Sequence, residues 1–288
     1  MKKIVVFYIL LFSFCACMAN VPEEQEKPGW RLTFQDEFDE PVLNDYRWYS
    51  SYRPGLMLRM KQLGKKPAAD KQVELSPNAH YVIEDGILKL RIDEKLPARP
   101  EKSDNCVSGI QTSDFRYGAN NEIQFMDKFA QKYGWFEIRS RMPSGSGLNS
   151  AFWLTQSDPR DQEVVDGVRV TEGLMEIDIF EQLGRQTGQH LIQFHVHITG
   201  FGSIYNLGFD PSKEFHVYAL EWEEGALRWY VDGKMVLEYI GETPLKKMFV
   251  LLDLYQNSGT PGWTGTTDPN MPYPRDFEID YIRVYVKD

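Results

Sequence analysis

The stretch 174-LMEIDIFEQ-182 places three acidic residues within an apolar segment. Side chains alternate between the two faces of a β-strand, so Glu176 and Asp178 share one face and the isoleucines share the other. Glu181 stands at an odd offset from Asp178 and would point into the apolar side, where an unpaired carboxylate is costly. One extra residue within Ile179–Phe180, a β-bulge, returns Glu181 to the acidic face. The stretch therefore predicts a buried, bulged strand that presents three carboxyl groups together.

This spacing of acids indicates a particular chemistry. Neighbouring carboxyl groups cannot all ionise freely, so one keeps its proton to a higher pH and provides a general acid beside a nucleophile. Glu176 and Glu181 would lie roughly 13 Å apart at the backbone, and long side chains leaning together approach the roughly 5 Å between the carboxyls of a retaining glycosidase. Two other interpretations remain open: a calcium site, or a solvated acidic face with Ile177, Ile179 and Phe180 buried behind it.

Short alternating segments separated by turn signals run along most of the chain. Asp85-Gly86 and Asp232-Gly233 are dipeptides that favour tight hairpin turns. Long helical periodicity is nearly absent. Strands and hairpins are expected over 81–92, 134–142, 227–240 and 277–286. The chain is therefore predicted to be all-β, a β-sandwich or jelly roll, with long insertions such as 55–80 and 155–172 forming the walls of a cleft.

Composition limits the classes of function. A chain of 288 residues with 42% hydrophobic content suits one all-β domain. The formal net charge of −10 argues against nucleic acid as a partner. Aromatic residues make up 14% of the chain, which fits either a β-rich core or platforms for sugar stacking. Cys106 has no second cysteine near it in the body of the chain, so we expect a small buried thiol and no internal disulfide there.

The N-terminus is typical of an exported protein. Two lysines precede the short apolar run Ile4–Phe14, so residues 1–19 are predicted to be an export signal. The tetrapeptide 14-FCAC-17 loosely resembles a bacterial lipoprotein cleavage box, in which Cys17 would carry an outer-membrane lipid anchor. Cleavage after Ala19, giving a soluble product, is the competing interpretation. Residues 20–29 would form a tether and residues 30–288 the catalytic domain, located at the cell envelope, either on the surface or in the periplasm.

A second polar strand face follows the acids. In 189-QHLIQFHVHI-198, Gln193, His195 and His197 share one face, and they line the same cleft if this strand pairs with the acidic one. A histidine near Glu181 could tune its pKa or hold a sugar, although metal ligation or a plain polar surface would give the same pattern. Without convincing further ligands, His-x-His is a weak zinc signal.

Aromatic and basic residues complete the candidate site. Trp153 is expected to face the cleft, with core packing as the alternative, because either Trp153 or Phe152 must point inward. Trp263 is a second candidate for sugar binding, and it would serve equally well as a loop anchor. Arg139 and Arg141 lie on the polar face of their strand, where they could orient the catalytic carboxylates or simply face solvent.

The pattern Glu176-x-Asp178-x-x-Glu181 resembles the active-site signature of glycoside hydrolase family 16, in its bulged branch of laminarinases, agarases, porphyranases and carrageenases. Similar segments lie at 32–40, 133–154, 215–234 and 279–286. The resemblance implies a jelly roll of two curved antiparallel sheets with the substrate cleft on the concave face. It also implies that Glu176 is the nucleophile, Asp178 an assisting acid and Glu181 the acid/base.

The resemblance implies an endo-acting, retaining hydrolase that cuts internal β-linkages of a polysaccharide by double displacement. It implies a sugar-binding histidine, for which His195 is preferred over His197. We also expect a monomer and no cofactor in the chemistry. Asp280 resembles an acid that ligates a structural calcium ion in some relatives. The usual Gly-Gly-x-Trp loop of laminarinases is replaced by 254-LYQNSGTPGW-263. Galactans, agar-like polymers, carrageenans and host glycans therefore stay open beside β-glucans, as do a non-catalytic sugar-binding sandwich and a transglycosylase.

Overall fold

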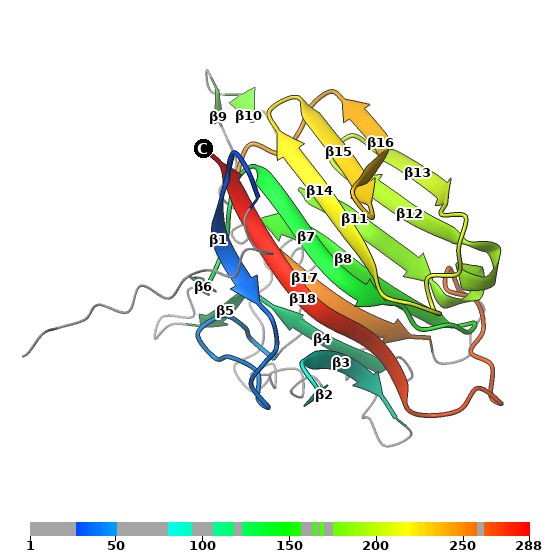
Figure 1. Cartoon of the computed structure of the whole chain (residues 1–288). Coiled ribbons are helices and arrows are strands. Elements are labelled where there is room, and N and C mark those ends of the chain that lie inside the picture. Colours follow the sequence, from blue (N-terminus) through cyan, green and yellow to red (C-terminus); the bar gives the residue numbers. More distant parts are fainter. Residues whose placement is uncertain are drawn as a thin grey trace, which may run out of the picture.

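The computed structural model describes residues 27–50, 80–93, 106–117, 123–156, 164–165, 168–169, 175–257 and 262–288. The predicted export signal, Cys17 and most of the tether lie outside these residues, as do most of the insertions 55–80 and 155–172. Within the described part the regular secondary structure is almost entirely β-strand (Figure 1). A search of the described residues finds no helix with the length and apolar content needed to cross a membrane.

The larger sheet is antiparallel and has eight strands in the order β16-β15-β14-β7-β18-β3-β2, with β1 also paired to β18. Its strands are β1 (Trp30–Asp36), β2 (Tyr81–Glu84), β3 (Ile87–Ile92), β7 (Gly134–Arg141), β14 (His216–Glu223), β15 (Ala226–Val231), β16 (Lys234–Ile240) and β18 (Arg275–Lys287). Of the segments in which strands were expected, 81–92, 134–142, 227–240 and 277–286 fall in this sheet. At both predicted hairpin turns the backbone has the positive φ that such turns require, 54° and 73° at Asp85 and Gly86 and 47° and 75° at Asp232 and Gly233.

The second sheet is also antiparallel and has six strands in the order β13-β12-β11-β8-β17-β4. They are β4 (Cys106–Gln111), β8 (Leu148–Gln156), β11 (Glu176–Leu183), β12 (Leu191–Val196), β13 (Phe201–Asn206) and β17 (Met248–Gln256), and a short 3₁₀ helix, η2 (Gly184–Gln189), follows β11. Two small pairs complete the described strands, β5 (Ser113–Tyr117) with β6 (Ile123–Asp127) and β9 (Val164–Val165) with β10 (Val168–Arg169).

One hydrophobic core lies between the two sheets. The six-stranded sheet contributes fully buried side chains such as Ile177, Phe152 and Phe194, and the eight-stranded sheet contributes Trp222 and Trp229. Because strand side chains alternate, every second residue of β8 and β12 enters this core and the residues between them face the opposite side, while β11 contributes Ile177, Ile179 and Phe180 to the core. The prediction of an all-β sandwich is confirmed, and the acids of β11 occupy the face that points away from the core.

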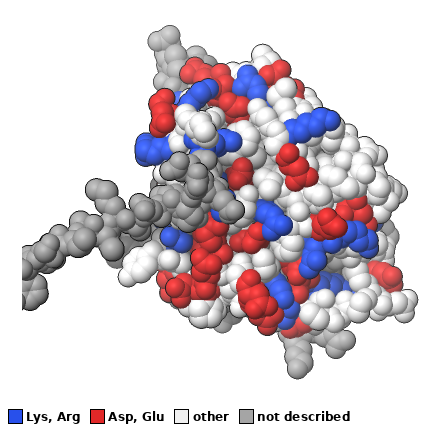
Figure 2. Space-filling view, in the orientation of Figure 1, with Lys and Arg blue, Asp and Glu red and all other residues white. Residues whose placement is uncertain are grey.

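The outward face of the eight-stranded sheet is a mixed charged surface. Figure 2 shows acidic and basic side chains interspersed on this side of the molecule. Pairs such as Arg91 with Asp276 and Arg283 with Glu37 join neighbouring elements across it. Opposite charges are therefore compensated locally, and the described residues form no continuous basic stripe on this face of the kind that follows a nucleic-acid backbone.

Candidate active site

The bulge that was predicted from the odd offset between Asp178 and Glu181 along the chain is present in β11. Against β8, Asp178 pairs with Trp153 and Phe180 pairs with Phe152, so Ile179 is the extra residue. Against β12 the register also shifts between Asp178 and Glu181. A bulge disrupts the ladder, and the indole Nε1 of Trp229 donates to the carbonyl oxygen of Asp178 at 3.2 Å from the opposite sheet. The kink that aligns the acids is thus fixed by the core behind them.

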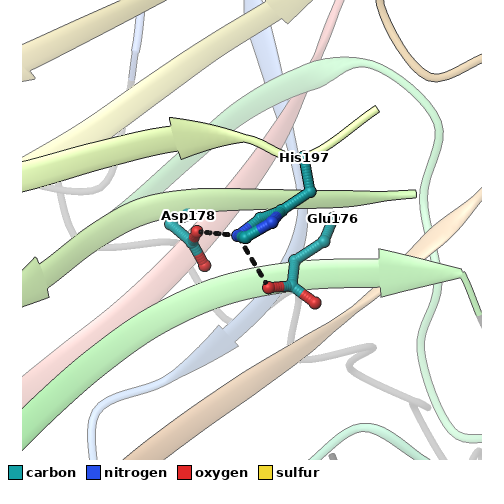
Figure 3. A group of neighbouring side chains, drawn as sticks. All are labelled: Glu176, Asp178 and His197. Carbon is teal, nitrogen blue, oxygen red and sulfur yellow. Dashed lines mark hydrogen bonds and ion pairs between the residues drawn. The ribbon is translucent and has the colours of Figure 1, made fainter. Parts of the chain in front are cut away.

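Three acids and two histidines meet on the face of β11 and β12 that points away from the core. His197 Nε2 lies 3.1 Å from both Glu176 Oε1 and Asp178 Oδ2 (Figure 3). His195 Nδ1 lies 2.9 Å from Glu181 Oε2 and 3.7 Å from Asp178 Oδ2. Each imidazole therefore lies between Asp178 and one of the two glutamates, and Asp178 is the centre of the cluster.

Burial and mutual repulsion raise the pKa of two acids in the cluster, Glu176 and Asp178. Burial, followed by the charge of Asp178, raises the pKa of Glu176 to about 8, while His197 acts in the opposite direction. Burial also raises the pKa of Asp178 well above its ordinary value, and the nearby charges of Glu181 and Asp253 add to the effect. A proton is held to a higher pH, as expected, but the acids concerned are Asp178 and Glu176, and Glu176 was predicted to be the nucleophile and not the general acid.

His195 is held between an acid and a glycine. The pKa of His195 is raised, mainly by its hydrogen bond with Glu181, so the imidazolium form is favoured beside that carboxylate. A Cβ atom at Gly202 on β13 would lie only 2.7 Å from Cδ2 of His195, so the absence of a side chain there gives the ring its space. Gln193, the third polar residue predicted for this face, is buried and donates through Nε2 to Gln186 at 2.9 Å.

Trp153 lies on the acidic face, opposite Asp178, as predicted. Its ring is only 6% exposed because it packs with Ala151, Phe249 and Leu251. The indole Nε1 donates to Oδ1 of Asp253 at 2.8 Å. Its predicted sugar-stacking role stays a prediction, since what the ring does in this structure is to hold a buried carboxylate.

Asp253 is a fourth acid of the site, and sequence reasoning missed it. It lies on β17, is 2% exposed, and its charge helps to raise the pKa of both Glu176 and Asp178. A signal was present, because Asp253 interrupts the apolar run 249-FVLLDLYQ-256. Its position became clear only with the pairing of β17 to β8, which places Asp253 beside Ala151.

Arg139 and Arg141 do not reach the acids, and the hypothesis that they orient the catalytic carboxylates is wrong. Both belong to β7 in the eight-stranded sheet, where they pair with Asp280 and Glu278 of β18 and lie over the ring of Phe215. The same pairing bears on the calcium prediction. The carboxylate of Asp280 is already bound by a guanidinium, which would repel a cation at that oxygen, so the donor set does not favour calcium there.

Trp263 is half exposed in the loop that follows residue 261. Arg185 of η2 donates to its carbonyl oxygen at 3.3 Å, and the amide of Gly147 donates to the carbonyl oxygen of Thr264 at 3.0 Å. The loop is thus attached at the end of β11 and the start of β8. Sugar binding by Trp263 stays a prediction, and its exposed ring fits that role better than the buried ring of Trp153.

The cluster also has the spacing of metal ligands. One ligand atom from each of Glu176, Asp178 and His197 lies within 4.8 Å of the others, and the same holds for Asp178, Glu181 and His195. Nitrogen and carboxylate donors at such distances suit a zinc-like cation. The same five groups also suit acid–base chemistry at a glycosidic bond, so the donor set does not by itself distinguish these roles.

A bulged strand that presents two glutamates around a buried aspartate, on the outer face of a two-sheet sandwich, supplies the paired carboxyl groups that glycosidase sites use. The family model for glycosyl hydrolases family 16 matches residues 70–282. The chain therefore belongs to glycoside hydrolase family 16, whose members hydrolyse O-glycosyl bonds and share the jelly-roll fold.

Several characterised proteins are similar over most of the chain. It is 26% identical to glucan endo-1,3-beta-glucosidase A1 of Niallia circulans, covering 92% of this chain and 39% of that protein. It is 31% identical to a beta-glucanase of Acetivibrio thermocellus, covering 61% and 50%, and 32% identical to a beta-glucanase of Brevibacillus brevis, covering 91% and 86%. The chain thus spans half or less of the length of the first two relatives.

Solved structures agree with this assignment. An endo-β-galactosidase of Clostridium perfringens that releases GlcNAcα1-4Gal has a TM-score of 0.69 at 25% identity, over 91% of this chain and 63% of that one. The catalytic domain of a laminarinase from Thermotoga petrophila has a TM-score of 0.66 at 25% identity, over 90% and 98%. Both neighbours support the predicted jelly roll.

Proposed function

We propose that this protein is an endo-acting, retaining glycoside hydrolase that cleaves internal β-linkages of a polysaccharide. The observation that carries the proposal is the bulge at Ile179, which places Glu176 and Glu181 on one face with a buried Asp178 between them. Retaining hydrolysis requires two carboxyl groups on opposite sides of one glycosidic bond, one ionised and one protonated. Each glutamate here has its own imidazole partner, so the two have distinct surroundings.

The proposed reaction is a double displacement. Ionised Glu176 attacks the anomeric carbon while Glu181 gives its proton to the leaving oxygen, which breaks the glycosidic bond and forms a glycosyl-enzyme ester. Glu181 then takes a proton from water, whose oxygen attacks the same carbon and releases Glu176. His195 holds the carboxyl group of Glu181, and no cofactor enters the reaction. Asp178 is buried behind the pair and retains a proton, so it limits the negative charge around the nucleophile.

The protonation of Glu176 gives the reaction a pH dependence. Attack requires the ionised carboxylate, whereas the surroundings raise the pKa of Glu176 to about 8 in the free protein. The ionised fraction therefore rises with pH and reaches about one half near that value. We expect kcat/KM to increase from acidic to mildly alkaline pH as Glu176 ionises.

The substrate class that we propose is a β-glucan, with a β-galactan as the alternative. Three relatives named above are glucan endo-1,3-beta-glucosidase or beta-glucanases, which supports the first. The similarity to an endo-β-galactosidase supports the second. The loop that ends at Trp263 lacks the laminarinase-type Gly-Gly-x-Trp sequence, so we expect contacts with the substrate there to differ from those of a typical laminarinase.

A screen for released reducing sugar on laminarin, mixed-linkage glucan, agarose, porphyran, carrageenan and mucin glycans tests the proposal. Glu176→Gln and Glu181→Gln should each abolish release while the circular dichroism spectrum stays native. Proton NMR of the first products should show the β-anomer. Binding without release on every polymer would indicate a non-catalytic sugar-binding sandwich, and longer oligosaccharides from short ones would indicate a transglycosylase.

We also propose that the protein is an exported monomer with an outer-membrane lipid anchor at Cys17. The lysines and the short apolar run at the N-terminus support export, and 14-FCAC-17 supports lipidation. Labelling of cells with a fatty acid should mark the wild-type chain and leave Cys17→Ala unmarked. Equal labelling of both chains, or none of either, would contradict the anchor, while recovery of the protein in the cytoplasm would contradict export. Light scattering of the secreted domain measures the oligomeric state.

A further inference from the structure

A row of side chains leads from Glu181 to the edge of the six-stranded sheet. Residues that pair directly on neighbouring strands share a face of the sheet. Glu181 on β11 pairs with Gln193 on β12, and Gln193 pairs with Ile204 on β13, which is the edge strand (Figure 1). Ile204 therefore lies on the same outer face as the acids, two strands from Glu181, or about 10 Å at the usual spacing of strands.

This row is covered on one side of Glu181 and exposed on the other. Toward β8 and β17, Glu181 is followed by Ala151 and Asp253, which are 3% and 2% exposed. Ala130, which lies between β6 and β7, packs against the cluster that contains Ala151. Toward β13 the row ends at Ile204, which is 60% exposed. Among the described residues, the outer face near the acids is therefore accessible on the side of β12 and β13.

Three residues form the exposed surface on this side. Gln193 does not contribute to it, because the side chain is buried and its Nε2 donates to the 3₁₀ helix η2 at 2.9 Å. In the neighbouring row Gly202 pairs with His195, has no side chain and is exposed, while the imidazole of His195 is partly exposed. Within these two rows, the exposed surface of β12 and β13 thus consists of His195, Gly202 and Ile204.

The chemistry of this surface suits an uncharged sugar. The side chain of Ile204 is apolar, and a pyranose ring presents a face of C–H groups that gains free energy when it leaves water for such a contact. Sulfate and carboxylate groups are commonly bound by arginine or lysine. The six described strands of this sheet contain neither, whereas most strands of the eight-stranded sheet contain at least one. The strands therefore offer an anionic sugar no charged partner.

We propose that Ile204 and the adjoining surface of β12 and β13 form a subsite that binds an uncharged sugar unit of the polysaccharide. The inference rests on the proposed function. A polymer that is cut at an internal linkage extends past the acids in both directions, and this surface continues the site on the accessible side. Ile204 contacts the sugar but none of the reacting atoms, so it contributes to substrate affinity and not to the chemical step.

The test compares Ile204→Ala with the control Ile240→Ala in the full chain. Ile240 is 67% exposed and ends β16, the edge strand of the other sheet, so it matches Ile204 in type and exposure. On the polymer that wild type cleaves best, Ile204→Ala should raise KM about fivefold with little change in kcat, because the contact is the same before and in the transition state. Ile240→Ala should leave both constants unchanged.

An unchanged KM in Ile204→Ala, or an equal rise in Ile240→Ala, would overturn the subsite while the proposed function stands. If wild type releases no sugar from any polymer, the proposed function fails, and calorimetric titration with hexasaccharides of laminarin and agarose decides about the subsite. Weaker binding to Ile204→Ala than to wild type would support it, whereas equal binding, or none to wild type, would overturn it. Tighter binding of a sulfated carrageenan hexasaccharide than of the neutral ones would contradict an uncharged ligand.

Discussion

Replacement of Glu176 by glutamine should stabilise the fold at neutral pH while it abolishes hydrolysis. The surroundings raise the pKa of Glu176 from its ordinary value of 4.5 to about 8. Between these two pH values the folded chain holds a proton that the unfolded chain has released. The free energy of unfolding therefore falls as pH rises through this window. Glutamine keeps the shape of the side chain and never has to ionise, so the variant lacks this loss.

The magnitude follows from the size of the window. Each pH unit above 4.5 costs the wild type about 1.4 kcal/mol, which gives about 3 kcal/mol at pH 7 and about 5 kcal/mol above pH 8. The two proteins should be equally stable near pH 4. At pH 7 a difference of about 3 kcal/mol corresponds to roughly 6 °C or more in Tm for a chain of this size.

Urea unfolding followed by tryptophan fluorescence at pH 4, 5.5, 7 and 8.5 measures the difference. Glu242→Gln, which changes an exposed glutamate, is the matched control and should show little change at any pH. The reasoning would be refuted if Glu176→Gln were no more stable than wild type at pH 7. It would also be refuted if the gain were the same at every pH, because repulsion and burial would then not be its source.

Three further changes probe the groups around the acids. Trp153→Phe removes the donor to the buried Asp253 and should cost about 2 kcal/mol in urea unfolding, together with a loss of kcat/KM; unchanged stability would contradict the role of that hydrogen bond. Gly202→Ala brings a methyl group to 2.7 Å from the His195 ring and should lower kcat about tenfold, with native circular dichroism, whereas wild-type kinetics would mean that the ring moves freely. Zn²⁺ should inhibit competitively and reversibly with EDTA, and His197→Asn should weaken that inhibition about tenfold; inhibition of equal strength in the variant would place the ion elsewhere.

The bulge and the shared acidic face could be predicted because they are local properties of one strand. In a regular strand Glu181 would face the side opposite to Asp178 and so enter the core. A carboxylate in the core is costly, so a bulge that returns Glu181 to the acidic face is the more favourable arrangement. The alternation of His195 and His197 was equally local. Which acid each histidine contacts could not be predicted in this way. That contact depends on the register of β12 against a bulged β11, and sequence alone does not give that register.

Arg139 and Arg141 illustrate a second limit. Alternation placed them correctly on a polar face, but a sandwich has two outer faces, and the sequence does not say to which sheet a strand belongs. The placement of β7 between β14 and β18 puts both arginines on the sheet opposite the acids. Asp253 was missed for the converse reason, since its strand lies about 70 residues beyond β11 in sequence and joins the site only through β8.

A cluster of buried acids survives in this fold because the core supports it from behind. Glu176 and Asp178 each oppose folding at neutral pH, since burial and like charge disfavour their ionised forms. The backbone that carries them is held by Trp229, which comes from the opposite sheet and donates to the carbonyl oxygen of Asp178 at the bulge. The large apolar interface between the sheets therefore does more than close the sandwich. Its burial stabilises the fold enough to offset the cost of keeping the acids close together. It also fixes the kink that directs Glu181 to the same side as Glu176.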